Sequence, residues 1–196
     1  MLLPVSTYER APVGLFFIKD ATTVEGGNVG KIEAGAAAQL GKVVVNKANG
    51  QDTSTAMLGL IDESSTGSKY SGLGNTGMFG TLVPSVGAKT TVGPSSTFGS
   101  GKCTIWTTSG IFVTDQYNTT EITENTAVGT ALYASAAGVL QTTQVGSGAV
   151  VGNVIKVFEG GIDSTLNAIT DAELYGVLPR IQSLPTGTKL LLFKFK

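Results

Sequence analysis

Carboxylate side chains are the residues of this sequence that are best suited to acid–base chemistry. The candidates are Asp52, the pair Asp62 and Glu63, and the pair Asp171 and Glu173. Hydrolysis of a sugar bond needs two carboxyl groups at a defined separation across a cleft. These residues are scattered and stand among turn-forming residues, which favours solvated loop positions. A carboxylate-based cell-wall hydrolase is therefore an alternative that requires two of them to converge in a cleft.

Histidine is absent from the 196 residues, and cysteine occurs once, as Cys103. Histidine is the commonest acid–base residue near neutral pH and a frequent zinc or copper ligand. Catalytic triads of the Ser–His or Cys–His type and His-ligated metal sites are therefore excluded, and so is an intrachain disulfide. We expect no enzymatic activity, no cofactor and no bound metal.

Three short motifs match the sequence patterns of functional sites but lack the surroundings that those sites require. Gly72–Gly77 matches the dinucleotide-binding spacing, but a Ser/Gly-rich loop precedes it where a strand is required. Residues 99–103 resemble the end of a phosphate-binding loop, with Cys103 where a Ser or Thr should hold magnesium. Residues 118–120 form a glycosylation sequon. We expect all three to be turns.

The composition indicates a protein that packs against other proteins. Charged residues make up 14% of the chain, against a usual share of about 25%. Such a surface can be covered by a partner without burying many ions, which is costly when they are unpaired. The basic residues are scattered, which argues against nucleic-acid binding, and no apolar run approaches the length of a membrane span. Without a signal peptide, synthesis in the host cytoplasm is expected and a secreted adhesin is disfavoured.

The sequence pattern along the chain predicts mainly short strands and turns. The prediction is an all-β barrel or sandwich of short antiparallel strands, with at most one short helix, at 163–178. A strand at 41–46 is closed by Asn49-Gly50, the favoured hairpin pair. The other strand predictions are two hairpins and two single strands: 103–107 with 111–114, 131–134 with 139–142, 150–158, and 188–196.

Some residues in and near these segments have predicted environments. The strand at 188–196 alternates lysines with apolar residues, which is typical of an edge strand. Glu121 and Glu124 are expected at solvent-facing strand positions. Trp106 is expected to serve packing or an interface, because aromatic residues contribute strongly to both.

Two segments are candidates for contact with a partner. Residues 1–20 are interrupted by Pro4 and Pro12, which predicts an extended N-terminal arm, with a first strand of the domain's own sheet as the alternative. Residues 61–100 form a Gly/Ser-rich surface excursion within the β-rich domain, 21–196. Such segments can bind by adding to an exposed sheet edge. The candidate interface residues are Leu15, Phe16, Phe17, Ile18, Tyr70, Leu73, Met78 and Phe79.

The run Ile122–Tyr133, followed by Ala137–Leu140 and Gly148–Val154, resembles the small β domain of head decoration and capsid-stabilising proteins of tailed bacteriophages. The resemblance covers about 40 residues. It implies a structural virion protein that binds the major capsid protein on the outside of the shell, bridges capsomers and forms a dimer or trimer. A tail, fibre or baseplate component that contacts the host is the alternative. No catalytic residues accompany the resemblance.

Overall fold

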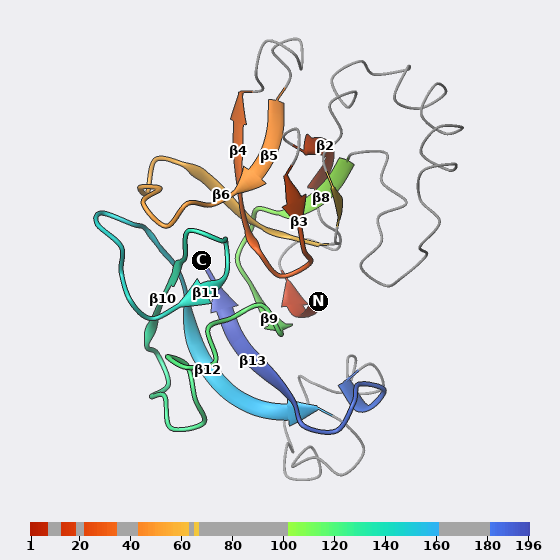
Figure 1. Ribbon diagram of the computed structural model, residues 1–196, viewed down its shortest axis with the longest axis vertical. Helices are drawn as coiled ribbons and strands as arrows, with labels where there is room; N and C mark the ends of the chain where they lie inside the picture. Colours follow the sequence, from red (N-terminus) through yellow and green to blue (C-terminus); the bar gives the residue numbers. More distant parts are fainter. Residues whose placement is uncertain (8–12, 19–21, 35–42, 63–64, 67–101, 161–180) are drawn as a thin grey trace.

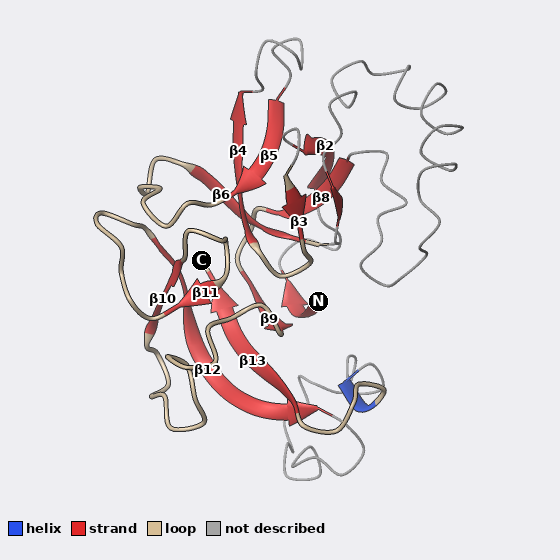
Figure 2. Cartoon of the chain, viewed as in Figure 1, coloured by secondary structure: helices blue, strands red, loops and turns tan. Residues whose placement is uncertain are grey.

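The computed structural model describes residues 1–7, 13–18, 22–34, 43–62, 65–66, 102–160 and 181–196 (Figure 1). Strands dominate these residues, and a helical turn at 181–182 is the exception that Figure 2 shows. The predicted all-β class is confirmed. The predicted helix at 163–178 and most of the 61–100 excursion lie outside the described residues.

One sheet has six strands and is antiparallel throughout. In spatial order its strands are β1 (Leu2–Thr7), β9 (Gly110–Thr114), β13 (Thr188–Phe195), β12 (Val150–Gly160), β10 (Ala131–Ala134) and β11 (Leu140–Gln141). The chain therefore builds this sheet from its first strand and from its C-terminal half.

The second sheet closes into a five-stranded barrel in the order β2-β5-β4-β6-β8. Its strands are β2 (Val13–Ile18), β4 (Val29–Ala34), β5 (Val43–Lys47), β6 (Met57–Ile61) and β8 (Lys102–Trp106). β2 and β5 run parallel, and the other neighbours are antiparallel. A two-stranded ladder of β3 (Thr23–Val24) and β7 (Ser65–Thr66) accompanies the barrel.

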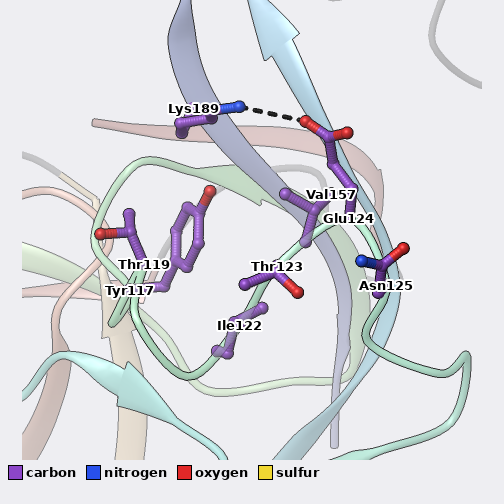
Figure 3. Close-up of a pocket in the computed structure, with 8 residues that line it drawn as sticks. All are labelled: Tyr117, Thr119, Ile122, Thr123, Glu124, Asn125, Val157 and Lys189. Carbon is purple, nitrogen blue, oxygen red and sulfur yellow. Dashed lines mark hydrogen bonds and ion pairs between the residues drawn. The ribbon is translucent and has the colours of Figure 1, made fainter.

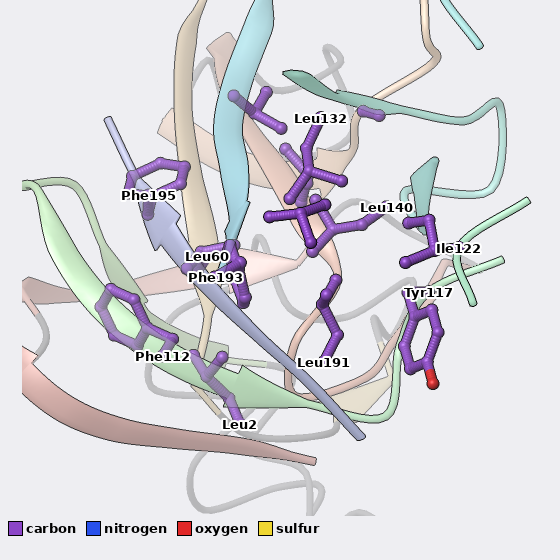
Figure 4. Close-up of a cluster of buried hydrophobic side chains, with 14 of the residues drawn as sticks. Leu2, Leu60, Phe112, Tyr117, Ile122, Leu132, Leu140, Leu191, Phe193 and Phe195 are labelled. Carbon is purple, nitrogen blue, oxygen red and sulfur yellow. The ribbon is translucent and has the colours of Figure 1, made fainter. Parts of the chain in front are cut away.

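An apolar core joins the barrel to the six-stranded sheet (Figure 4). Leu60 on the barrel and Phe193 on the sheet are both fully buried in it. Trp106 and Phe112 meet edge to face, with ring centroids 5.6 Å apart. This geometry suits the charge distribution of two aromatic rings. The barrel and the sheet are thus parts of one packed unit.

Both faces of the six-stranded sheet are apolar, which explains the nearly continuous apolar sequence of β13. Leu191 and Phe193 face the barrel, whereas Leu190 and Leu192 pack into a second cluster on the opposite face. A third cluster, which includes Ile18, Val45 and Ile105, fills the barrel.

The predicted hairpin across residues 108–110 is wrong, although both of its strands exist. β8 pairs with β2 and β6 of the barrel, whereas β9 pairs with β1 and β13 of the sheet. The chain crosses between the two sheets here, and the Trp106–Phe112 contact spans the crossing. Asn49-Gly50 likewise joins no hairpin, because β4 lies between β5 and β6.

The predicted edge position of the C-terminal strand is also wrong. β13 lies inside the sheet and pairs with β12 on one side and β9 on the other. Its lysine side chains are exposed to solvent, although the backbone of the strand is paired on both sides. The strand at 150–158 is confirmed within β12, and the hairpin of β10 and β11 is confirmed with Gly138 in its turn at a φ of 74°.

Candidate functional site

The described part of the predicted N-terminal arm forms strands in both sheets of this chain. Residues 2–7 form β1 in the six-stranded sheet, and residues 13–18 form β2 in the barrel. Strands of the domain's own sheets were the alternative to a free arm. Ile18 is fully buried in the barrel interior, and Phe16 packs partly buried against the same cluster. Ile18 therefore cannot reach a partner. Leu15 and Phe17 belong to β2, and the other four predicted interface residues lie outside the described residues: Tyr70, Leu73, Met78 and Phe79.

An apolar patch that the sequence analysis did not select lies at one end of the barrel. Met57 is directly opposite Ile32, and Val43 is two residues from Val45 on β5. Directly paired residues and residues two apart share a face of a sheet. Val45 belongs to the core of the barrel, so all four side chains are on the interior face. Val43 and Met57 are nevertheless 52% and 64% exposed.

The exposure of this patch follows from the topology. β8 pairs with β6 only at Leu60 and Ile61, and the chain then leaves for the other sheet. No described strand continues that pairing beside Met57. We call Ile32, Ala34, Val43 and Met57 the barrel-mouth patch. The strand containing Val43 was predicted, but its exposure depends on long-range pairing that no local pattern encodes.

A groove of about 390 Å³ separates the start of β6 from the paired ends of β12 and β13. Its lining is largely apolar and includes Leu58 and Phe195, together with Lys196. Leu58 lies on the face of β6 opposite to Met57. The groove and the barrel-mouth patch therefore flank the same strand.

A smaller pocket of about 220 Å³, lined by both polar and apolar side chains, lies at the other end of the six-stranded sheet (Figure 3). Its lining comes from the turns after β9 and from β12 and β13: Tyr117, Thr119, Ile122, Thr123, Glu124, Asn125, Val157 and Lys189. Lys189 donates to Glu124 at 3.0 Å and also to Glu159. These two carboxylates raise the pKa of Lys189 above its ordinary value.

Tyr117 is the buried polar residue of this pocket. Its side chain is part of the large core, and the residue is only 5% exposed. Burial raises the pKa of Tyr117 to about 12, with Lys189 opposing the shift and Glu124 adding to it. The phenol is therefore neutral at physiological pH. Ile122, 1% exposed, and Val157 provide apolar surface beside it.

Glu121 holds the turns of this region together instead of occupying a strand. Its Oε2 atom accepts hydrogen bonds from the backbone N–H groups of Thr142, at 3.0 Å, and Thr143, at 2.9 Å. Asn118 donates its side-chain amide to Oε1 at 2.8 Å. The predicted strand position is wrong for Glu124 as well, because residues 119–126 form turns.

The candidate catalytic carboxylates are engaged elsewhere. Asp52 pairs with Lys31 at 2.7 Å, and Asp62 accepts a hydrogen bond from the indole of Trp106 at 2.8 Å. Glu63, Asp171 and Glu173 lie outside the described residues. The pairing required by the hydrolase alternative is not formed by Asp52 and Asp62, which serve separate structural contacts.

The remaining motifs add no site. The Gly72–Gly77 and 99–101 segments are outside the described residues, while Asn118 forms a turn in which its Oδ1 accepts from Thr120. Across the described part of the chain, no three His, Cys, Asp or Glu residues are grouped as metal ligands would be. Nor does any helix in that part have the length and hydrophobicity to cross a membrane.

Searches of protein-family models, curated proteins and solved structures find no match to this chain.

Proposed function

We propose that this protein is a structural subunit of a tailed-bacteriophage particle that binds the outer surface of the capsid and stabilises it by bridging capsomers. The barrel-mouth patch is the observation that carries the proposal. Val43 and Met57 are two of the three large hydrophobic side chains exposed in the described residues. Grouped exposed apolar side chains mark protein interaction sites.

The arrangement of the sheets supports a contact made by side chains. The barrel is closed, although no described strand pairs with β6 beside Met57 on the side of β8. Pro4 and a register shift interrupt β1, the edge of the other sheet, and both features hinder strand addition. A partner therefore binds through surfaces such as the barrel-mouth patch. In a symmetric shell many copies of a modest contact add to a large total stabilisation.

The resemblance to capsid-stabilising proteins also supports the proposal. Its residues include β10, β11 and the start of β12, and β10 pairs antiparallel with each of the other two strands. The fold requires glycine at position 152 of this motif, because a Cβ atom there would lie 2.3 Å from the carbonyl oxygen of Lys194. The low content of charged residues agrees with a surface that is covered in an assembly.

The test is to mix the purified protein with phage heads that lack it and to measure binding by sedimentation and cryo-electron microscopy. We expect saturable binding at a fixed site on the shell and greater resistance of the heads to heat. Val43→Glu and Met57→Glu should each reduce binding, because they place a charge in the contact. Val128→Glu is the matched control, since Val128 is 78% exposed and stands outside the patch.

Thermal unfolding of the three variants alone tests whether each remains folded. Failure of the wild-type protein to bind heads, with density at the tail instead, would favour the tail or fibre alternative. Equal binding by the wild type and both patch variants would remove the barrel-mouth patch from the interface.

A further inference from the structure

The start of β6 has a backbone edge that no described strand covers. Just after β6, Asp62 donates to the Thr104 carbonyl of β8 at 3.1 Å. Backbone groups of residues two apart point to the same side of a strand, so those of Leu60 and Leu58 also face the β8 side. β8 pairs with Leu60 through Trp106 and then leaves the barrel. The N–H and C=O groups of Leu58 therefore have no partner among the described residues.

The departing chain also carries an unused hydrogen-bonding group. Because Trp106 is paired with Leu60, a continued ladder would place Thr108 opposite Leu58. The ladder stops before that pair, and the Oγ1 atom of Thr108 is buried without a hydrogen-bond partner among the described residues. Buried polar atoms usually have a partner. Polar groups therefore remain unused on both chains at the point where β8 parts from β6.

The residue with the unpaired backbone also lines the apolar groove between β6 and the ends of β12 and β13. Leu58 lines this groove together with Val151 and Phe195, which are both almost fully buried. Among the described lining residues, Lys196 is the one with an ionisable side chain. The volume of about 390 Å³ is within the range of roughly 300–1,000 Å³ that is typical of binding pockets. Leu58 thus provides an unpaired backbone and an apolar wall at one place.

These features select an extended polypeptide segment as the occupant. A helix bonds its backbone groups internally, whereas an extended segment presents N–H and C=O groups to a strand edge and alternate side chains to one face. A folded sheet would gain little, because the open part of β6, from Met57 to Gly59, is shorter than a usual strand of about five to six residues. The apolar lining favours uncharged side chains, because a charge removed from water without a partner is costly.

We propose that the edge of β6 at Leu58 and the adjoining groove bind an extended, apolar, uncharged segment of a partner protein, which adds to β6 as a strand. The backbone of the segment bonds to Leu58, and its alternate side chains pack into the groove. Met57 points to the opposite face of β6, so this site uses other side chains than the barrel-mouth patch. The proposal does not rest on capsid binding, and either one can fail alone.

The experiment titrates the full-length protein with synthetic peptides and follows its backbone amides by NMR. The peptides alternate threonine with valine, leucine or phenylalanine, are capped at both ends and carry no charge. We expect saturable shifts at residues 56–58 and 149–151 with at least one peptide. The Leu58 amide should exchange rapidly with solvent in the free protein and become protected in the complex. The same peptides with N-methylated backbones should not bind, because they cannot donate to a strand edge.

Substitutions on either side of the groove's rim test its part in binding. Ala56→Glu should weaken binding about tenfold, because it places a carboxylate among the apolar groups of the groove. Thr55→Glu is the matched control, since Thr55 is exposed next to Ala56 and does not line the groove. Val43→Glu, in the barrel-mouth patch, should bind the peptides as the wild type does.

Four results would each overturn the proposal. The first three are the absence of saturable shifts with every peptide, equal binding of the N-methylated peptides, and a Leu58 amide that is already protected in the free protein. The fourth is self-association of the protein alone, measured by sedimentation, that Ala56→Glu abolishes and Thr55→Glu does not. That result would assign the groove to a second copy of this chain.

Discussion

Replacing Glu121 by glutamine should destabilise the protein through one mismatched hydrogen bond. Oε2 faces the N–H groups of Thr142 and Thr143, and Oε1 faces the Asn118 amide. Glutamine has one oxygen and one NH₂ group, so one of these two sides would present a donor to a donor. Asn118 cannot flip to compensate, because its oxygen already accepts from the backbone and hydroxyl of Thr120.

The expected cost at pH 7 is about 2 kcal/mol, the typical penalty for leaving a partly buried polar group without its partner. For a chain of this size that corresponds to a fall in Tm of roughly 4–8 °C. Denaturant unfolding followed by the fluorescence of Trp106, the single tryptophan, measures the free energy, and calorimetry measures Tm. Glu124→Gln is the control, because Glu124 is 61% exposed and exposed ion pairs contribute little.

The effect should depend on pH in one direction. Burial favours a higher pKa for Glu121, but hydrogen bonds from Thr143 and Thr142 outweigh it and lower the pKa below its ordinary value of 4.5. A lowered folded-state pKa means that the stabilisation is complete above the unfolded-state pKa and is lost as the pH falls through the folded-state value. The gap between the wild type and Glu121→Gln should therefore narrow below about pH 4.5. Equal unfolding midpoints at pH 7, or a gap unchanged in acid, would refute the reasoning.

Three other substitutions test the packing, each by the same unfolding measurements. Gly152→Ala should cost about 1–3 kcal/mol, because its Cβ would lie 2.3 Å from the carbonyl oxygen of Lys194; wild-type stability would contradict this close approach. Phe112→Ala should cost about 3–5 kcal/mol by opening a cavity between barrel and sheet, and a loss below 1 kcal/mol would argue against that core. Asp62→Ala should cost about 1–2 kcal/mol by removing the acceptor of the Trp106 indole, whereas Asp62→Asn, which keeps an oxygen, should cost less; equal losses would exclude the hydrogen bond.

The strands were predictable where the sequence signal is local. β12 and β13 contain long runs of apolar and β-branched residues, and the β10–β11 hairpin has a glycine that its turn requires. Such patterns specify an extended backbone and a turn, but they do not specify which sheet a strand joins. The residues at 108–110 have turn chemistry, yet they connect two sheets. Lysines at the end of β13 likewise indicated an edge, although the strand pairs on both sides.

The candidate sites were not predictable, because they depend on contacts between distant segments. Glu121 meets Thr142 across 21 residues, and Lys189 meets Glu124 across 65. Tyr117 gives no local sign that it is buried beneath a pocket. Met57 is exposed because β8, more than 40 residues later in the sequence, stops pairing with β6 at Trp106. Periodicity can assign a residue to a face of a strand, but the topology decides whether that face is covered.

The two edge strands of the six-stranded sheet, β1 and β11, limit how this protein can associate. At one edge, Pro4 and the register shift in β1 interrupt the outer backbone groups. At the other edge, the segment after β9 covers Leu140 of β11. The N–H group of Leu140 donates to the carbonyl of Gln116, and its carbonyl accepts a hydrogen bond from the N–H group of Asn118. With its backbone groups occupied, β11 offers little to an added strand. Both edges of this sheet therefore favour association through side chains, and in the described residues the barrel-mouth patch provides exposed apolar side chains for it.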